Sequence, residues 1–234
     1  MRVEVFSDVI CPWCAIGKRR LERALTRFDH AGDVDVVWRA YELDPTAPPR
    51  RSGDYPGRLA AKYGMSRAQA AAANVKLTAL AAAEGLDFHF DKVKPGNTFD
   101  AHRLLHYAAT TGPHRQDVLK ERLFRAYFTD GVAVGEKEPL LQVAVEAGFD
   151  ATGCTAVLDS DRYEAEVRAD EREALDLGVS GVPFFLVDGR FAVAGAQDPD
   201  TLLLALQRAW AKGPGLDAST QNGGASCAVD DVAH

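Results

Sequence analysis

Residues 6–14, Phe6-Ser7-Asp8-Val9-Ile10-Cys11-Pro12-Trp13-Cys14, govern the interpretation of the rest of the chain. The stretch follows an alternating apolar run and opens a helical pattern, so its two cysteines lie at a predicted strand-to-helix turn. The first turn of a helix offers unpaired N–H groups and the positive end of the helix dipole, which favour a thiolate. The spacing and the position together indicate a redox-active dithiol.

The four residues of the dithiol loop have different expected roles. Cys11 is expected to be exposed and to act as the attacking sulfur, and Cys14 to be the resolving sulfur that releases a mixed disulfide. Pro12 suits the opening of a helix, where its missing donor costs nothing. Trp13 can present a flat apolar surface to an unfolded peptide or another hydrophobic partner.

A pair of cysteines with this spacing has two other interpretations. It is half of a zinc site, but structural zinc usually needs a second clustered pair, and Cys154 and Cys227 each stand alone. The pair can also be two cysteines without a function. We expect a redox role and no metal.

The composition limits the classes of protein to which the chain can belong. With 27 basic and 34 acidic residues the net charge is −7, and no basic stripe compensates locally, which argues against nucleic acid as a partner. No apolar run is long enough to cross a bilayer. The chain opens directly on a strand pattern without a signal sequence, so we expect a cytoplasmic protein, where a lone dithiol is more often catalytic than structural.

Hydrophobic periodicity predicts an α/β chain with a helical block in its middle. The predicted strands are 2–7, 34–43, 184–187 and 190–193, the last two joined by the hairpin signal Asp188-Gly189. The predicted helices are 12–28, 58–63, 66–84, 97–110, 116–128, 137–147, 155–177 and 200–212. We expect residues 1–45 and 178–212 to form one domain in two halves, interrupted by a helical domain at 46–177 and followed by a disordered tail at 213–234.

Four motifs in order carry a resemblance to a known family. They are residues 7–14 with Gly17 behind them, 41–45 (Tyr-Glu-Leu-Asp-Pro), 97–104 (Asn-Thr-Phe-Asp-Ala-His-Arg-Leu), and 178–185 followed by 195–197. Together they make the chain similar to the thioredoxin superfamily and, within it, to the DsbA-like oxidoreductases of the FrnE type. The resemblance implies a thioredoxin fold, which is a four-stranded mixed sheet of order 2-1-3-4, with a large all-helical insertion between strands two and three.

The same resemblance implies a role for Val182-Pro183. The peptide bond between them would be cis and packed against the dithiol, and the Val182 backbone would bind the backbone of a peptide or of glutathione. From the residues alone, a trans proline that opens an edge strand is equally compatible.

Two related families are similar to the chain in the insertion and in the 97–104 motif. They are the kappa-class glutathione transferases and the 2-hydroxychromene-2-carboxylate isomerases, which carry a serine where Cys11 stands. This departure favours dithiol exchange and puts tight glutathione binding in doubt, while glutathione remains a candidate reductant.

Three further residues are candidate modulators of the dithiol. His102 could stabilise a thiolate or move a proton, or it could simply be packed in a helix face. Glu42 could be a buried acid that tunes Cys14, or a solvent-facing strand residue. Asn97 is expected to be a helix N-cap rather than a ligand contact. The buried carboxylate that thioredoxin-like proteins often carry six residues before the first cysteine is missing, since that residue is Val5, so another group or water must take the proton from Cys14.

The sequence therefore predicts a thiol–disulfide oxidoreductase or isomerase that acts on protein or small-molecule disulfides. No metal or organic cofactor is expected, since the electrons come from or go to another thiol pair. Two alternatives stay open. One is a glutathione-dependent isomerase or transferase acting on a small aromatic or polyketide-like molecule, and the other is a chaperone that binds peptides without redox activity.

Overall fold

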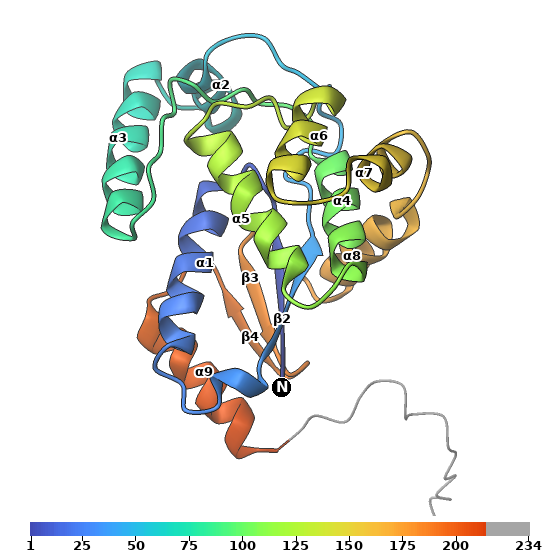
Figure 1. Cartoon of the computed structure of the whole chain (residues 1–234). Helices are drawn as coiled ribbons and strands as arrows, with labels where there is room; N and C mark the ends of the chain where they lie inside the picture. The colour runs from blue at the N-terminus through green and yellow to red at the C-terminus, as the bar shows by residue number, and fades with distance from the viewer. Residues whose placement is uncertain (214–234) are drawn as a thin grey trace, which may run out of the picture.

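The central sheet contains the four strands expected from the sequence. In the computed structural model, which describes residues 1–213, they are β1 (Arg2–Ser7), β2 (Asp35–Ala40), β3 (Phe184–Val187) and β4 (Phe191–Ala194). Their order is β2-β1-β3-β4, with β1 parallel to β2 and antiparallel to β3 (Figure 1). This confirms the predicted thioredoxin fold. The tail predicted to be disordered lies, apart from its first residue, outside the described residues.

The strands alternate between two covered faces. Val3, Val5 and Phe185 pack with Leu21 and Leu206, which belong to α1 (Pro12–Leu25) and α9 (Pro199–Ala211).

The hairpin between β3 and β4 turns through Asp188 and Gly189, which both have positive φ, of 54° and 66°. This conformation is the one that two-residue hairpin turns favour, and the predicted hairpin is confirmed.

Seven helices lie between β2 and β3 in the described part of the chain, as the predicted insertion requires. They are α2 (Tyr55–Tyr63), α3 (Arg67–Ala83), α4 (Phe99–Thr110), α5 (Arg115–Phe128), α6 (Lys137–Glu146), α7 (Ala151–Leu158) and α8 (Glu164–Asp176). A short 3₁₀ turn, Ala31–Asp33, precedes β2. Figure 1 shows α4 to α8 gathered above and beside the β2 edge of the sheet, and α2 and α3 on the other side of α5.

The insertion closes the outer edge of β2 with side chains. The Gln116 amide of α5 accepts a hydrogen bond from Trp38 N at 2.9 Å and donates one to Trp38 O at 2.8 Å, so it occupies the place of a neighbouring strand. The Asp170 carboxylate of α8 accepts from Ala40 N at 2.7 Å. Trp38, Ala40, Gln116 and Asp170 are all buried. Backbone groups left unpaired at this strand edge would therefore be costly. These bonds attach α5 and α8 to the sheet.

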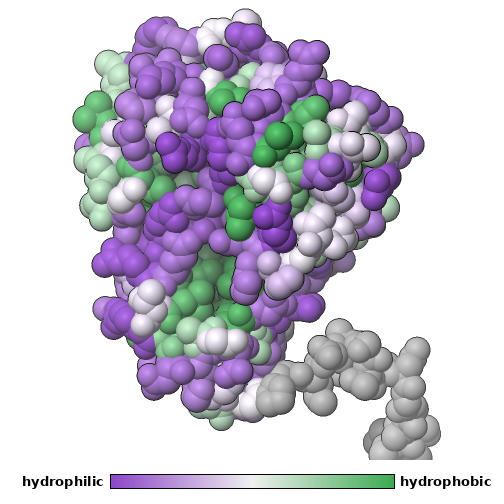
Figure 2. Space-filling view, in the orientation of Figure 1, coloured by the Kyte–Doolittle hydropathy of each residue, from purple (hydrophilic) through white to green (hydrophobic). Residues whose placement is uncertain are grey.

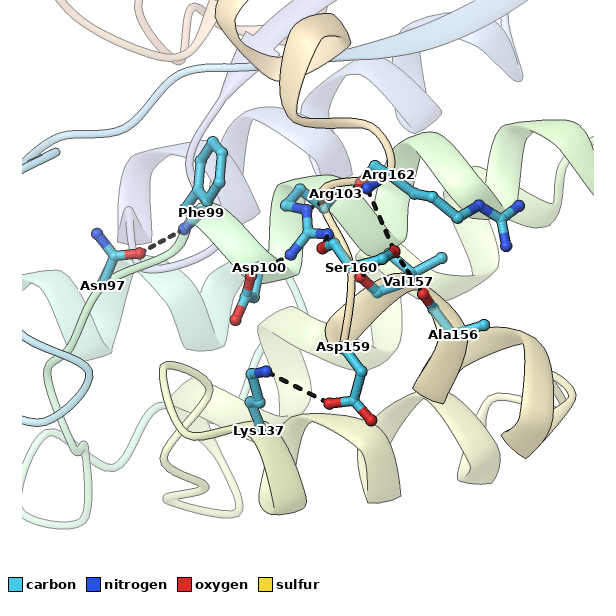
Figure 3. A network of polar contacts seen from close by, with 10 residues as sticks. All are labelled: Asn97, Phe99, Asp100, Arg103, Lys137, Ala156, Val157, Asp159, Ser160 and Arg162. Carbon is cyan, nitrogen blue, oxygen red and sulfur yellow. Dashed lines mark hydrogen bonds and ion pairs between the residues drawn. The ribbon is translucent and has the colours of Figure 1, made fainter.

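The single helix predicted at 155–177 is wrong. It is two helices, α7 and α8, separated at residues 159–163, where Tyr163 adopts a positive φ of 65°. The buried guanidinium of Arg103 donates to the carbonyls of Val157, Ser160 and Arg162, the first at 2.5 Å and the last at 2.9 Å (Figure 3). Arg103 thus satisfies the carbonyls that a helix end exposes, and it reaches them from α4, far away in the sequence.

The opposite edge of the sheet is open. An apolar groove runs between β4 and α9, lined by Phe191, Val193, Leu204 and Ala205, and Figure 2 shows a hollowed apolar patch over this part of the molecule. None of the cysteines of the described part of the chain lines it. No helix within residues 1–213 is long and apolar enough to cross a membrane.

We expect Arg103→Met to destabilise the fold by about 3 kcal/mol, because it leaves one buried carbonyl, two partly buried carbonyls and Asp100 without their donor. Urea unfolding measures the free energy. Arg162→Met, at an exposed arginine of the same turn, is the matched control and should change it by less than about 0.5 kcal/mol. Equal effects of the two substitutions would contradict this account of the break.

Candidate active site

The dithiol lies at the start of α1, at the carboxyl end of β1. Cys11 is the N-cap residue of α1, with Pro12 at the first helical position, and its side chain makes no capping hydrogen bond. Cys14 N donates to Cys11 O at 3.0 Å, which places the second cysteine one turn along. The first turn of α1 contains no acidic residue, so no carboxylate there opposes the N–H groups that in general make a helix start favourable for negative charge.

Both sulfurs are enclosed, which corrects the expectation that Cys11 is exposed. Cys11 is 4% exposed and Cys14 is fully buried, whereas Trp13 between them is 43% exposed. The hydroxyl of Tyr55, on α2 of the insertion, lies near enough to Cys11 that a charge on the thiol raises the pKa of Tyr55, although burial contributes more. Tyr55 also packs against the buried cluster that contains Cys11, so the insertion contributes to the surroundings of this thiol. Trp13 is thus accessible beside the dithiol, and its predicted role as a surface for a peptide or another hydrophobic partner stays a prediction.

The strand that follows the insertion meets the dithiol. The Cys11 thiol donates to Val182 O at 3.5 Å, and the Val182–Pro183 peptide bond is cis, as the resemblance implied. A Cβ atom on Gly17 would lie 2.8 Å from Pro183 Cγ, so α1 can approach the proline this closely because residue 17 has no side chain. The structure thus brings together Cys11, Cys14, Val182 and Pro183, which are distant in sequence.

Buried charged groups lie behind the dithiol, in the β1–α1 turn and the insertion. Asp8 accepts from Leu43 N at 2.8 Å and from Ile10 N at 3.4 Å. His102 Nε2 lies 3.6 Å from Asp8 Oδ1. Burial lowers the pKa of His102, with the Asp8 carboxylate opposing this shift, so the imidazole is neutral at physiological pH. His102 therefore faces Asp8, and its predicted modulation of the dithiol stays a prediction.

The two cysteines differ in the groups that act on them. Burial raises the pKa of the Cys14 thiol well above its ordinary value, and the hydrogen bond with Cys11 adds to this effect. The positive charge of Lys120 opposes it. Lys120, on α5, is itself fully buried, and it is a residue of the site that was not among the predicted modulators. A lysine within a predicted amphipathic helix gives no signal of such a position, which depends on how α5 docks.

Glu42 and Asn97 meet at the end of β2. Asn97 Nδ2 donates to Glu42 Oε1 at 3.1 Å, and Arg168 Nη1 donates to Glu42 Oε2 at 2.8 Å. The solvent-facing interpretation of Glu42 is wrong, because the residue is buried. Burial raises the pKa of Glu42 to about 7, an effect that Arg168 opposes and the nearby Glu171 carboxylate reinforces. Since its partners are Asn97 and Arg168, its predicted action on Cys14 stays a prediction.

The predicted N-cap is also wrong in detail. The residue at the N-cap of α4 is Thr98, and Asn97 lies one position earlier, where its Oδ1 accepts from Phe99 N at 2.8 Å (Figure 3). The amide thus spans the start of α4 and the acid at the end of β2. Cys154 is buried within α7, and Cys227 lies outside the described residues.

Comparison with known proteins identifies the family. Residues 2–207 match the DSBA-like thioredoxin domain family, and the chain belongs to that family. The crystal structure of a probable DsbA oxidoreductase from Streptomyces coelicolor is 44% identical, with a TM-score of 0.87, covering 99% of this chain and 100% of that one. The uncharacterized protein YwbO of Bacillus subtilis is 26% identical over 88% of this chain and 96% of its own.

A more distant structure shares the fold alone. The cytosolic disulfide reductase DsbM from Pseudomonas aeruginosa, solved with GSH, is 18% identical with a TM-score of 0.63, covering 89% of this chain and 98% of that one. Because the chain belongs to the DSBA-like thioredoxin domain family, it is a DsbA-like thiol oxidoreductase.

The raised pKa of Glu42 predicts a dependence of stability on pH. Protonated Glu42 contributes to the free energy of unfolding. This contribution is present in full below the pKa of Glu42 in the unfolded state, about 4.5, and is lost as the pH rises through its folded-state pKa, about 7. Relative to Glu42→Gln, which does not ionise, the wild type should therefore lose up to about 3 kcal/mol of stability over this interval and nothing further above it.

Urea unfolding of both proteins at several pH values measures this difference. Glu164→Gln, at an exposed residue in the first turn of α8, is the control and should follow the wild type throughout. A constant difference between Glu42→Gln and the wild type would show that Glu42 keeps its ordinary ionisation in the folded state.

Proposed function

We propose that this member of the DsbA-like family is a thiol–disulfide oxidoreductase in which Cys11 is the nucleophile and Cys14 the resolving thiol. The observation that carries the proposal is the position of Cys11 at the uncapped start of α1, with Cys14 one turn behind it. The helix start lowers the cost of a thiolate at the first position, whereas burial keeps the second cysteine protonated until it is needed.

The reduction of a disulfide then takes two exchanges. The Cys11 thiolate attacks one sulfur of the substrate, the substrate disulfide breaks, and the departing sulfur leaves with the electron pair as a thiolate. Cys14 next attacks the Cys11 sulfur of this mixed disulfide, which forms the Cys11–Cys14 bond and releases the second substrate thiol. The protein dithiol is oxidised by two electrons and the substrate is reduced, and the reverse sequence oxidises a substrate dithiol.

The surroundings of Cys11 support binding of a peptide-like substrate. The Val182 carbonyl that accepts from the Cys11 thiol loses this donor when the sulfur bonds to a substrate, and it then becomes free to accept from a backbone N–H of that substrate. Trp13 and Pro12 supply the adjoining surface, and Pro183 holds Val182 in place against α1. Protein and peptide disulfides are therefore the proposed substrates.

A second thiol must return the dithiol to its starting state. We assign this role to another protein dithiol or to glutathione, because the similar DsbM structure was solved with GSH. DsbM is described as a cytosolic disulfide reductase, and a cytoplasmic location for the present chain stays a prediction.

Reduction of insulin disulfides with dithiothreitol as electron source tests the proposal. The wild type should accelerate the reaction well above background, and Cys11→Ser should abolish the acceleration because it removes the nucleophile. Cys14→Ser should lose most turnover and accumulate a mixed disulfide on Cys11, detectable by mass. Cys154→Ser, at a buried cysteine of α7, is the control and should retain wild-type turnover.

Other outcomes distinguish the alternatives. The oxidoreductase proposal would be contradicted if the wild type failed to accelerate insulin reduction although its dithiol could be reduced. Activity towards a small aromatic substrate that needs glutathione and survives Cys14→Ser would instead support an isomerase or transferase. Suppression of aggregation that persists when both cysteines are serine would support a chaperone.

A further inference from the structure

Lys120, which forms no salt bridge with any residue from 1 to 213, is buried behind the dithiol. Lys120 has no exposed surface, and within residues 1–213 its ammonium has one hydrogen-bond acceptor, Ser7 O, at 3.5 Å. The rings of Trp38 and Phe124 lie beside it, with centroids 5.4 and 5.2 Å from Nζ. A buried ammonium usually has a paired carboxylate, because transfer of a charge out of water is costly. This position is therefore poorly explained as a structural ion pair.

Another buried lysine of the same chain shows the contrast. Lys18, on α1, has Nζ 3.2 Å from both Asp117 and Glu121 and also pairs with Glu22. These carboxylates raise its pKa against the effect of burial. Lys18 is a conventional ion-paired residue, and Lys120 is not.

The titratable groups that face Lys120 come from the β1–α1 turn, α1, α4 and its own helix: Asp8, Cys11, Cys14, His102 and Asp117. Burial lowers the pKa of Lys120 to about 8, and the strongest opposing effect is the negative charge of the Cys14 thiolate. The ammonium and the Cys14 thiolate thus stabilise each other. When Cys14 is not ionised, Lys120 loses its proton easily near physiological pH and becomes a neutral amine.

We propose that Lys120 accepts the proton of Cys14 when Cys14 attacks the mixed disulfide, and that it takes up another proton and gives it to Cys14 when the dithiol is formed again. The inference rests on the proposed function and adds to it the group that ionises the resolving thiol. Lys120 would then take the place of the buried carboxylate that thioredoxin-like proteins often carry six residues before the first cysteine, where this chain has Val5.

The step balances without any further reactant. The neutral amine of Lys120 takes the proton of the Cys14 thiol, which gives an ammonium and a thiolate. The thiolate forms a bond with the Cys11 sulfur, and the bond from Cys11 to the substrate sulfur breaks, with the electron pair leaving on the substrate. The ammonium then releases its proton to solvent, since the thiolate that favoured it is gone.

The other buried groups are less suited to this task. Both carboxylate oxygens of Asp8 accept backbone N–H groups, from Ile10 and Leu43, and these bonds hold the turn before Cys11. His102 is directed at Asp8, 3.6 Å away. Lys120 and Cys14 act directly on each other, because the ammonium lowers the pKa of Cys14 and the Cys14 thiolate raises the pKa of Lys120.

Reaction of the reduced protein with the chromogenic aromatic disulfide DTNB separates the two steps, in a background where Cys154 and Cys227 are serine. Attack by Cys11 releases the first coloured thiolate, and ring closure by Cys14 releases the second. In stopped flow, the wild-type rate of the second release should rise with pH through about 8. Lys120→Met should slow it about a hundredfold near neutral pH and move the rise to higher pH, with the first release little changed.

Two more variants define the role. Lys120→Arg keeps the charge but does not lose its proton in this range, so its second release should stay slow. Lys18→Met removes the ion-paired lysine and should leave the second release unchanged. A first release at the wild-type rate shows that the surroundings of Cys11 are intact, because unfolding would expose this buried thiol and change its rate of reaction.

Several results would overturn the inference. They are an unchanged second release in Lys120→Met, recovery of the wild-type rate by arginine, or an equal slowing of both releases. Absence of the first release in the wild type is a different failure, because it removes the proposed function itself.

Discussion

The amide of Gln116 against the outer edge of β2 is the contact on which the arrangement of the site depends. It satisfies both backbone groups of Trp38 in the direction a further strand would take, so α5 is held in register with the sheet and cannot slide without breaking both bonds. Lys120 lies one helical turn further along α5 and is thereby carried behind Cys14. A contact that resembles sheet pairing thus positions a charged group of the insertion beneath the dithiol.

The two cysteines of one helical turn acquire different chemistry from their surroundings. Cys11 lies at the start of α1 and donates to the carbonyl of Val182, whereas Cys14 lies one turn deeper, where burial disfavours its thiolate. Separating the ionisation of two identical side chains in this way assigns them different roles. The insertion takes part in both environments, through Tyr55 near Cys11 and Lys120 near Cys14.

Features encoded locally could be predicted from the sequence, and features that depend on distant contacts could not. The dithiol at a helix start and the hairpin at Asp188-Gly189 follow from neighbouring residues, and the strand order came from the resemblance to a family. The break between α7 and α8 depends on Arg103, and the buried position of Lys120 behind the dithiol depends on how α5 docks on the sheet. No pattern within either segment contains this information.

The order of the strands also affects how the chain folds as it is synthesised. The central strand β1 is made first, and β2 completes a strand-helix-strand unit soon afterwards, but β3, the other neighbour of β1, follows the whole insertion. Until β3 emerges from the ribosome, one edge of β1 and the apolar side chains of Val3 and Val5 have no cover from it. The pairing of β1 with β3 is thus a late, long-range step, and the nascent chain passes through an interval in which it exposes an edge prone to association.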